Sequence, residues 1–203
     1  MIAAPSLASG GEFVRQALGV VPETGGEHPG MGTHNLLLRL GEAIYLEVIA
    51  INPDAPRPNR ARWFGLDHLG AGAVPRLATW VARTDDIRSA AASSPLPLGN
   101  VESMRRGEWN WLVTIPADGG LPAHGIAPTL IQWPNGLHPA SKLQDLGCSL
   151  IRLEGFHPEP ERIVAVLNAI GFEGEFLVSR LEPGDQPRLA AVIQTRDGVR
   201  EIG

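Results

Sequence analysis

Apolar positions along this chain switch repeatedly between the alternation of a β-strand and the helical spacing of about 3.6 residues. Each switch follows one plan: a short apolar strand, a turn or capping residue, and an amphipathic helix closed by glycine or proline. The plan predicts helices over residues 10–20, about 85–94 and about 159–170. Gly19, Pro95 and Gly171 mark the expected ends of these helices.

Strands joined by short turns are predicted after each helix, because β-branched and aromatic residues gather there between turn-forming residues. Asp197-Gly198 is a strong signal for a tight turn between the last two strands. The strands are expected over residues 33–41, 43–53, 108–116, 128–136, 175–183, 188–196 and 198–202.

The strand–helix openings recur at a regular distance along the chain. Their corner positions, Pro5, Thr84 and Pro158, are 79 and 74 residues apart. This period is too long for a solenoid repeat and fits a duplicated unit of one helix and several strands. The predicted fold class is α+β, with mostly antiparallel sheets in one domain over residues 1–203. Two βαβββ modules, at about 1–70 and about 76–140, precede a C-terminal partial third module at about 147–203.

Composition narrows the classes of function. Hydrophobic residues make up 43% of the chain and the formal net charge is −5, which leaves no electrostatic footprint for nucleic acid. The single cysteine, Cys148, excludes an internal disulfide and a cysteine-only zinc site. No apolar run reaches the roughly 20 residues that cross a membrane, and the first residues lack the pattern of a signal peptide. We therefore expect a cytoplasmic protein.

Glu47 places a carboxylate in the middle of an otherwise apolar strand, AIYLEVIAINP. Alternation puts Tyr45, Glu47 and Ile49 on one face of this strand and only apolar residues on the other. An ionised carboxylate buried there is costly unless a cation or hydrogen-bond donors compensate it. Two interpretations remain open: Glu47 pairs with Arg39 on the adjacent strand, or it faces inward as a metal ligand or general base.

A hydrophilic residue also occupies the centre of the corresponding strand in the second module. In TLIQWPNG, Gln132 shares a face with Leu130 and lies 85 residues after Glu47. Two modules that each place a metal-capable oxygen at the same strand position would build a specific site. Because glutamine is neutral, that site would carry less charge than a pair of carboxylates.

Ordered motifs over nearly the whole chain resemble the glyoxalase-like domain family of the vicinal oxygen chelate superfamily. The motifs are GGEHPGMGTHNLLLRLG, AIYLEVIAINPDAP, RWFGLD, LIQWPNGLHPA and LGCSLIRLEGFHPEPERI. The resemblance implies paired βαβββ modules whose curved sheets enclose a cavity. In the superfamily, this cavity usually holds a divalent metal bound by one residue from the first strand and one from the fourth strand of each module.

Carried over to this chain, the resemblance implies Glu47 and Gln132 as the fourth-strand metal ligands. The first-strand position of the second module falls at or near Thr79 or Trp80, and neither is an ordinary ligand. Relatives place an Asp-His pair in the first strand of the first module, whereas this chain begins at Met1. Either the true start lies upstream of Met1 or that ligand is missing, and we expect weak binding of a divalent metal or none.

The segment GGEHPGMGTHN, residues 25–35, carries two histidines among four glycines. A phosphate cradle would need a glycine-rich turn leading into a helix, whereas a strand is predicted to follow here. Gly25 and Gly26 are expected to form a turn. His28 and His34 are interpreted as substrate-binding residues at the rim of a pocket, with structural turn histidines and metal ligands as alternatives. His34 alternates with Asn35, so only one of them can face the cavity.

His138 lies in a proline-rich loop just after the second module's fourth strand, in LIQWPNGLHPA. A rigid loop can hold an imidazole over a cavity, so His138 is a candidate general acid or base; a structural loop histidine is the alternative. Trp133, beside Gln132, is a candidate substrate-binding residue. Trp109 and Trp111 share one strand face, where they form core packing or an aromatic cavity wall.

Two functional hypotheses follow. The first is a lyase, isomerase or related enzyme of the superfamily, acting on a small oxygenated substrate with Glu47 and His138 as catalytic groups and a divalent metal as the implied cofactor. The second is a metal-free protein that binds or sequesters a small molecule in the same cavity. Both expect a small-molecule partner, no nucleic acid and no membrane, and both are compatible with a homodimer.

Overall fold

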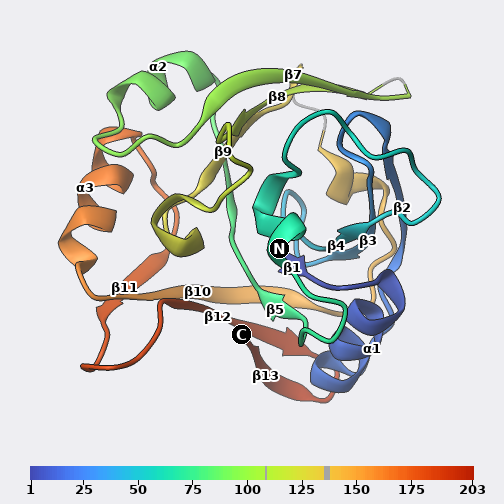
Figure 1. Ribbon diagram of the computed structural model, residues 1–203. Coiled ribbons are helices and arrows are strands. Elements are labelled where there is room, and N and C mark those ends of the chain that lie inside the picture. The colour runs from blue at the N-terminus through green and yellow to red at the C-terminus, as the bar shows by residue number, and fades with distance from the viewer. Residues whose placement is uncertain (108, 135–137) are drawn as a thin grey trace.

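Three small, mostly antiparallel sheets, each associated with one helix, make up the computed structural model of the protein (Figure 1). The structure describes residues 1–107, 109–134 and 138–203. The predicted strand positions 108 and 135–136 lie outside the described residues. Within the described residues, no helix is both long and apolar enough to span a membrane.

The first two sheets are built in the same way. Sheet one has the strand order β2-β3-β4-β1-β5 and sheet two the order β6-β9-β8-β7, and in each the opening strand pairs in parallel with the last strand of its module. Module one comprises β1 (Ile2–Ala3), α1 (Leu7–Leu18), β2 (Glu23–His28), β3 (Thr33–Arg39) and β4 (Tyr45–Ile51). The short strand β5 (Arg76–Leu77) then leads to β6 (Val81–Arg83), α2 (Ile87–Ser93), β7 (Asn100–Arg106), β8 (Trp109–Ile115) and β9 (Thr129–Gln132).

The third module keeps the element order but changes the pairing. Its elements are β10 (Ser149–His157), α3 (Pro160–Ala169), β11 (Phe176–Arg180), β12 (Arg188–Thr195) and β13 (Gly198–Ile202). Here β10 pairs in parallel with β11, the strand directly after the helix, and in antiparallel fashion with β12. The predicted fold class is confirmed, including the modified C-terminal module.

The helices begin and end at residues with identifiable caps. Helix α1 starts earlier than predicted because Ser6 and Ser9 form a reciprocal capping box, and it ends at Gly19, whose φ of 74° is left-handed. Helix α2 is capped by Asp86, whose carboxylate accepts the Ser89 N–H at 3.0 Å, rather than by Thr84 or Asp85.

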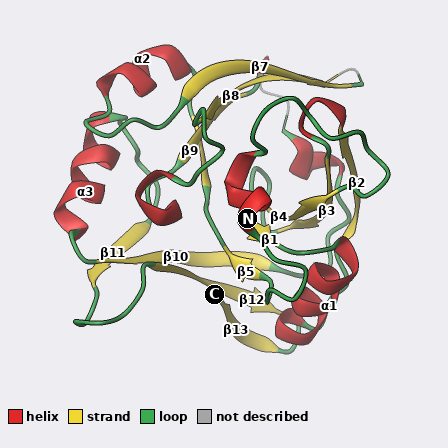
Figure 2. Ribbon diagram, viewed as in Figure 1, coloured by secondary structure: helices red, strands yellow, loops and turns green. Residues whose placement is uncertain are grey.

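Each face of sheets one and two packs in a different apolar cluster. The three helices lie at the outside of the molecule (Figure 2) and bury Val14, Ile87 and Ile163 in one common cluster. On the opposite face, sheets one and two contribute Ile49 and Trp111 to a second cluster. The alternation predicted for β4 is therefore confirmed, because Ile49 lies on the face away from the helices.

One segment differs from its prediction. Gly25 and Gly26 do not form a turn but lie within β2, which pairs with β3 and has an irregular register between Thr24 and Glu27. The turn comes later, in a short 3-10 helix (Pro29–Met31) closed by Gly32. The glycines are tolerated in the strand because the side chains of Asn35 and Arg106 pack against them.

Candidate functional site

A cavity lies between sheets one and two, on the face opposite the helices. The volume open to the centres of water-sized molecules is about 50 Å³. Sheet one contributes polar groups to the wall, from His28, Asn35, Tyr45 and Glu47. The wall from sheet two is apolar and aromatic except for one cation, Arg106. The cavity therefore has a polar side and an aromatic side.

Glu47 is held in place by a short chain of hydrogen bonds. Asn35 on β3 donates from Nδ2 to Glu47 Oε1 at 2.6 Å, and its own Oδ1 accepts the Gly26 N–H at 2.7 Å. Gly25 leaves room for this arrangement, since a Cβ there would come within 2.2 Å of Asn35 Oδ1. The amide of Asn35 is thereby fixed at both ends and orients the carboxyl.

The surroundings of Glu47 change the pKa of its carboxyl. Burial raises the pKa of the Glu47 carboxyl. The Asn35 hydrogen bond, the charge of the Met1 amino group and, last, the charge of Arg106 oppose this rise only in part. The predicted pairing with Arg39 is wrong, because Arg39 donates instead to the Gly41 carbonyl at 3.2 Å. A half-buried carboxyl with a raised pKa in a cavity is typical of groups that transfer protons.

His28 presents its ring to the same cavity from the end of β2. The Thr33 hydroxyl oxygen lies 3.1 Å from His28 Nδ1 and accepts the Trp63 indole N–H at 3.2 Å. Among the described residues, His28 is the one acceptor within reach of the Thr33 hydroxyl proton, so we assign Nδ1 as acceptor and place the ring proton on Nε2. Burial, and then the charge of Arg106, lowers the pKa of His28 to about 3, which keeps the ring neutral.

Aromatic rings line the remainder of the cavity. Trp111 and Trp133 pack with ring centroids 5.2 Å apart, and His28 packs edge-on against Trp63 at 5.1 Å. Trp63 in turn stacks on Phe64 at 5.1 Å. Phe64 has a φ of 61°, a left-handed conformation that bulky residues seldom adopt and that costs on the order of 1 kcal/mol or more. This backbone conformation places the Phe64 ring in the cavity wall.

Tyr45 and His138 meet at one edge of the cavity. Their ring centroids are 5.4 Å apart, and Tyr45 lines the cavity together with Pro139. The imidazole Nδ1 of His138 accepts the Ala140 N–H at 3.2 Å and so caps a short 3-10 helix, Pro139–Lys142. Burial, followed by the charge of Arg83, lowers the pKa of His138. His138 therefore packs against Tyr45, a residue of the cavity wall. The imidazole that lines the cavity together with Glu47 is that of His28.

Two predicted site residues, His34 and Gln132, lie on the faces of their strands that point away from the cavity. Gln132 donates to the Asp85 carbonyl at 2.7 Å and accepts the Ile87 N–H at 3.1 Å, so its amide caps the start of α2. His34 alternates with Asn35, and it is Asn35 that lines the cavity. A position one residue away along a strand points to the opposite face, which is why the match of Gln132 with Glu47 fails.

The first-strand position of module two also differs from its expected location. The carbonyl of Thr79 accepts a hydrogen bond from the Met1 amino nitrogen at 2.8 Å, and the indole of Trp80 donates to the Ile126 carbonyl at 2.9 Å. Neither side chain lines the cavity; the residue from this segment that does is Val81. Sheet two therefore places no metal-binding side chain at the positions that the resemblance implies.

The donor set can be tested against the divalent metal that the superfamily implies. A zinc-type site needs at least three protein ligands. Within residues 1–107, 109–134 and 138–203, no three His, Cys, Asp or Glu side chains gather closely enough to hold one. Glu47 and His28 both line the cavity, but two such side chains fall short of three ligands. These residues do not fit a metal centre, and we derive no step through one.

Sequence reasoning missed several residues of the wall. Trp63, Phe64, Val81 and Arg106 line the cavity, and none had been chosen as a site residue. Arg106 lies opposite Trp109 in the antiparallel pair of β7 and β8, and hence on the face of Trp111, but β7 is too polar for its composition to predict a strand. Trp63 and Phe64 come from an irregular 3-10 segment whose path follows no periodic pattern.

Two βαβββ modules lie around one cavity, as the resemblance to the glyoxalase-like domain family implies. The family described as "Glyoxalase-like domain" matches residues 1–171, and the chain belongs to this family. No curated protein matches the sequence significantly.

Solved structures at low identity share the fold. A triple mutant of 4-hydroxymandelate synthase from Streptomyces coelicolor is 17% identical, with a TM-score of 0.53. The match covers 98% of this chain and 60% of the synthase, so this chain spans about three fifths of the synthase's length. A hypothetical protein from Staphylococcus aureus is 14% identical, with a TM-score of 0.50, over 89% of this chain and 75% of that protein.

Proposed function

We propose that this chain is an enzyme that holds a small, planar, oxygenated molecule in the cavity and uses Glu47 to move a proton on or off it. The setting of the Glu47 carboxyl carries this proposal. The carboxyl faces aromatic walls, is oriented by Asn35, and has a pKa raised by burial. A carboxyl whose pKa moves toward neutrality is better matched to proton transfer near pH 7 than an ordinary one.

The reaction class that fits these groups is removal of a proton from a carbon next to a carbonyl. An ionised oxygen of Glu47 takes the proton, and the electrons of the broken C–H bond form the enolate, whose charge collects on the carbonyl oxygen. The Nε2–H of neutral His28 is suited to donate a hydrogen bond to that oxygen. Return of the proton to another carbon completes an isomerisation, and loss of a leaving group completes an elimination.

A second candidate function is metal-free binding or sequestration of a small molecule. It is favoured by the wall from sheet two, where Trp111, Val113, Ile131 and Trp133 offer contact area but no group that reacts. In that case the carboxyl of Glu47 would serve only as a hydrogen-bond partner for the ligand.

Deuterium exchange separates these functions. Phenylacetone carries acidic methylene protons between a ring and a carbonyl, and their loss in D₂O is followed by proton NMR. We expect the protein to accelerate exchange over buffer, Glu47→Gln to abolish the acceleration, and Glu27→Gln, at an exposed position of β2, to leave it unchanged. Equal rates with the wild type and Glu47→Gln would overturn the catalytic proposal. Binding without exchange would favour sequestration.

A further inference from the structure

One charged group in the cavity wall has no part in the proposed proton transfer. Arg106 is the last residue of β7 and lies directly opposite Trp109, so its side chain shares the face of sheet two that lines the cavity. The side chain reaches across to sheet one. There it packs on Gly26 of β2, where a methyl group would come within 3.1 Å of Arg106 Cδ and 3.3 Å of Nη1.

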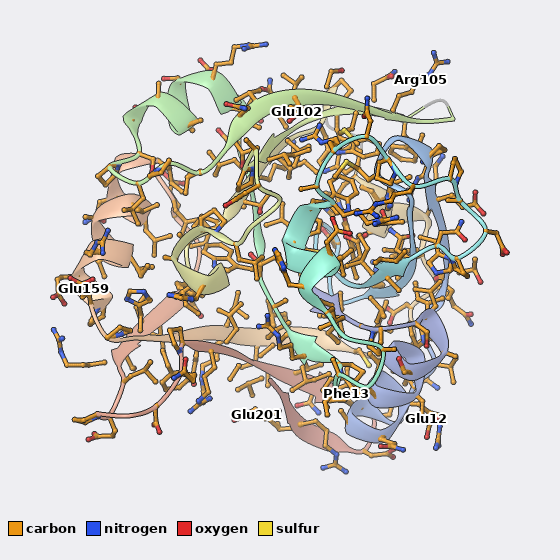
Figure 3. The ribbon with its side chains drawn as sticks, viewed as in Figure 1. Glu12, Phe13, Glu102, Arg105, Glu159 and Glu201 are labelled. Carbon is orange, nitrogen blue, oxygen red and sulfur yellow. The ribbon has the colours of Figure 1, made fainter. Side chains whose placement is uncertain are left out.

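Among residues 1–107, 109–134 and 138–203, no carboxylate forms an ion pair with Arg106. The carboxylate on the same face of β7, Glu102 (Figure 3), already holds a two-point contact with Arg60, with Nη2 and Oε1 2.8 Å apart. Arg62 is likewise paired with Asp67 at 2.6 Å.

The charge of Arg106 acts on the polar groups of the cavity. Burial has the largest effect on the pKa of both His28 and Glu47. The charge of Arg106 adds to the fall in the pKa of His28 and, after the Asn35 hydrogen bond and the Met1 amino group, opposes the rise in that of Glu47. It likewise opposes the rise in the pKa of Tyr45. Arg106 lines the same cavity as all three groups, in an aromatic and half-buried setting where water screens its charge poorly.

We propose that Arg106 binds the anionic end of the ligand, and that the substrate class is a small planar carboxylate whose ring or double bond lies against the tryptophans. A guanidinium offers two parallel N–H groups that match a carboxylate, and its strength rises where water is excluded. A cationic ligand would meet the unpaired charge of Arg106, which outweighs the attraction of aromatic rings for cations. This inference rests on the proposed use of the cavity.

Three ring compounds of similar size and different charge test the inference: benzoate, benzamide and protonated benzylamine. Their affinities are measured at pH 7 from shifts of the tryptophan indole N–H signals. We expect benzoate to bind more tightly than benzamide, and benzylamine to bind most weakly. Arg106→Gln should weaken benzoate binding about tenfold or more and leave benzamide binding unchanged. Arg105→Gln, on the outward face of β7 (Figure 3), is the matched control and should change neither.

The outcomes separate this inference from the proposed function. If benzamide binds as well as benzoate, or Arg106→Gln keeps the preference for benzoate, the inference is wrong while the cavity remains a ligand site. If benzylamine binds best, the cavity selects cations and the inference is also wrong. If none of the three compounds binds, the proposed use of the cavity fails, and the inference with it. The indole signal of Trp63, hydrogen-bonded to Thr33, reports whether Arg106→Gln is folded, and Arg106→Lys offers a milder variant if it is not.

Discussion

Replacing Glu47 with glutamine removes a charge from the cavity and keeps the shape of the side chain. Among the described residues, the carboxyl has no cationic partner within ion-pair distance and one side-chain hydrogen bond, from the Asn35 amide at 2.6 Å. Glutamine can still accept that hydrogen bond through its own oxygen. The substitution therefore breaks no ion pair, and the change in unfolding free energy depends on the balance of two opposing terms.

The first term favours the variant. Because burial raises the pKa of Glu47 in the folded state, ionisation at neutral pH costs stability, and each unit of such a shift corresponds to about 1.4 kcal/mol. The second term favours the wild type, since a hydrogen bond to an ionised acceptor exceeds a neutral one by on the order of 1 kcal/mol. We expect Glu47→Gln to be as stable as the wild type at pH 8, or more stable.

The pH dependence of the unfolding free energy tests the direction of the first term, the cost of ionising the buried Glu47 carboxyl. A carboxyl with a raised folded-state pKa binds its proton more tightly when the protein is folded, so the wild type is favoured below the ordinary glutamate pKa and loses that advantage as pH rises through the raised value. Chemical unfolding of both proteins at pH 4, 6 and 8 should show the variant gaining relative to the wild type as pH rises. A loss on the order of 3 kcal/mol at pH 8 would refute the reasoning, because it would mean that the charge of Glu47 is itself a structural partner.

Three further substitutions test the surroundings of the site by urea unfolding. Thr33→Val leaves the Trp63 indole and the His28 ring without their shared partner and should cost about 1–3 kcal/mol, whereas Thr33→Ser should cost less; equal losses would argue against the hydroxyl. Gly25→Ala places a methyl group within 2.2 Å of Asn35 Oδ1 and should cost about 1–3 kcal/mol and also slow phenylacetone exchange; unchanged exchange would show that Asn35 does not orient Glu47. Gln132→Leu removes the amide contacts at the start of α2 while the Asp86 cap stays, and should cost about 1 kcal/mol with no effect on benzoate binding; weakened binding would show that Gln132 acts on the cavity.

The parts of the site that sequence reasoning found are those set by strand alternation within a well-marked strand. The strand β4 is long and apolar, so Glu47 stood out, and its position with Tyr45 on the face of Ile49 followed from the period of two. The repeat of strand–helix openings was enough to predict two βαβββ modules and a modified third. These features are local in the sequence and need no knowledge of how distant segments pack.

The parts that failed depend on contacts between distant segments. The strand β9 has only four residues, too few for alternation to fix its faces, and the role of Gln132 as a cap depends on where α2 lies. The pair Gly25-Gly26 has the composition of a turn but forms a strand, because the side chains of Asn35 and Arg106 occupy the space beside it. Arg106 itself lies in NVESMRR, a strand too polar to be recognised from composition.

The location of a bound ligand tests the central claim most directly. Crystals of the protein soaked with phenylacetone should show the ring against Trp111 or Trp133, with the methylene carbon within contact distance of a Glu47 oxygen and the carbonyl oxygen toward His28. A Glu47→Gln crystal should show the same pose, because that variant keeps the cavity. Phenylacetone bound instead in the hollow between sheet two and the end of α3, lined by Arg83, Leu130 and Phe172, would contradict the claim that the cavity between the first two sheets is the ligand site.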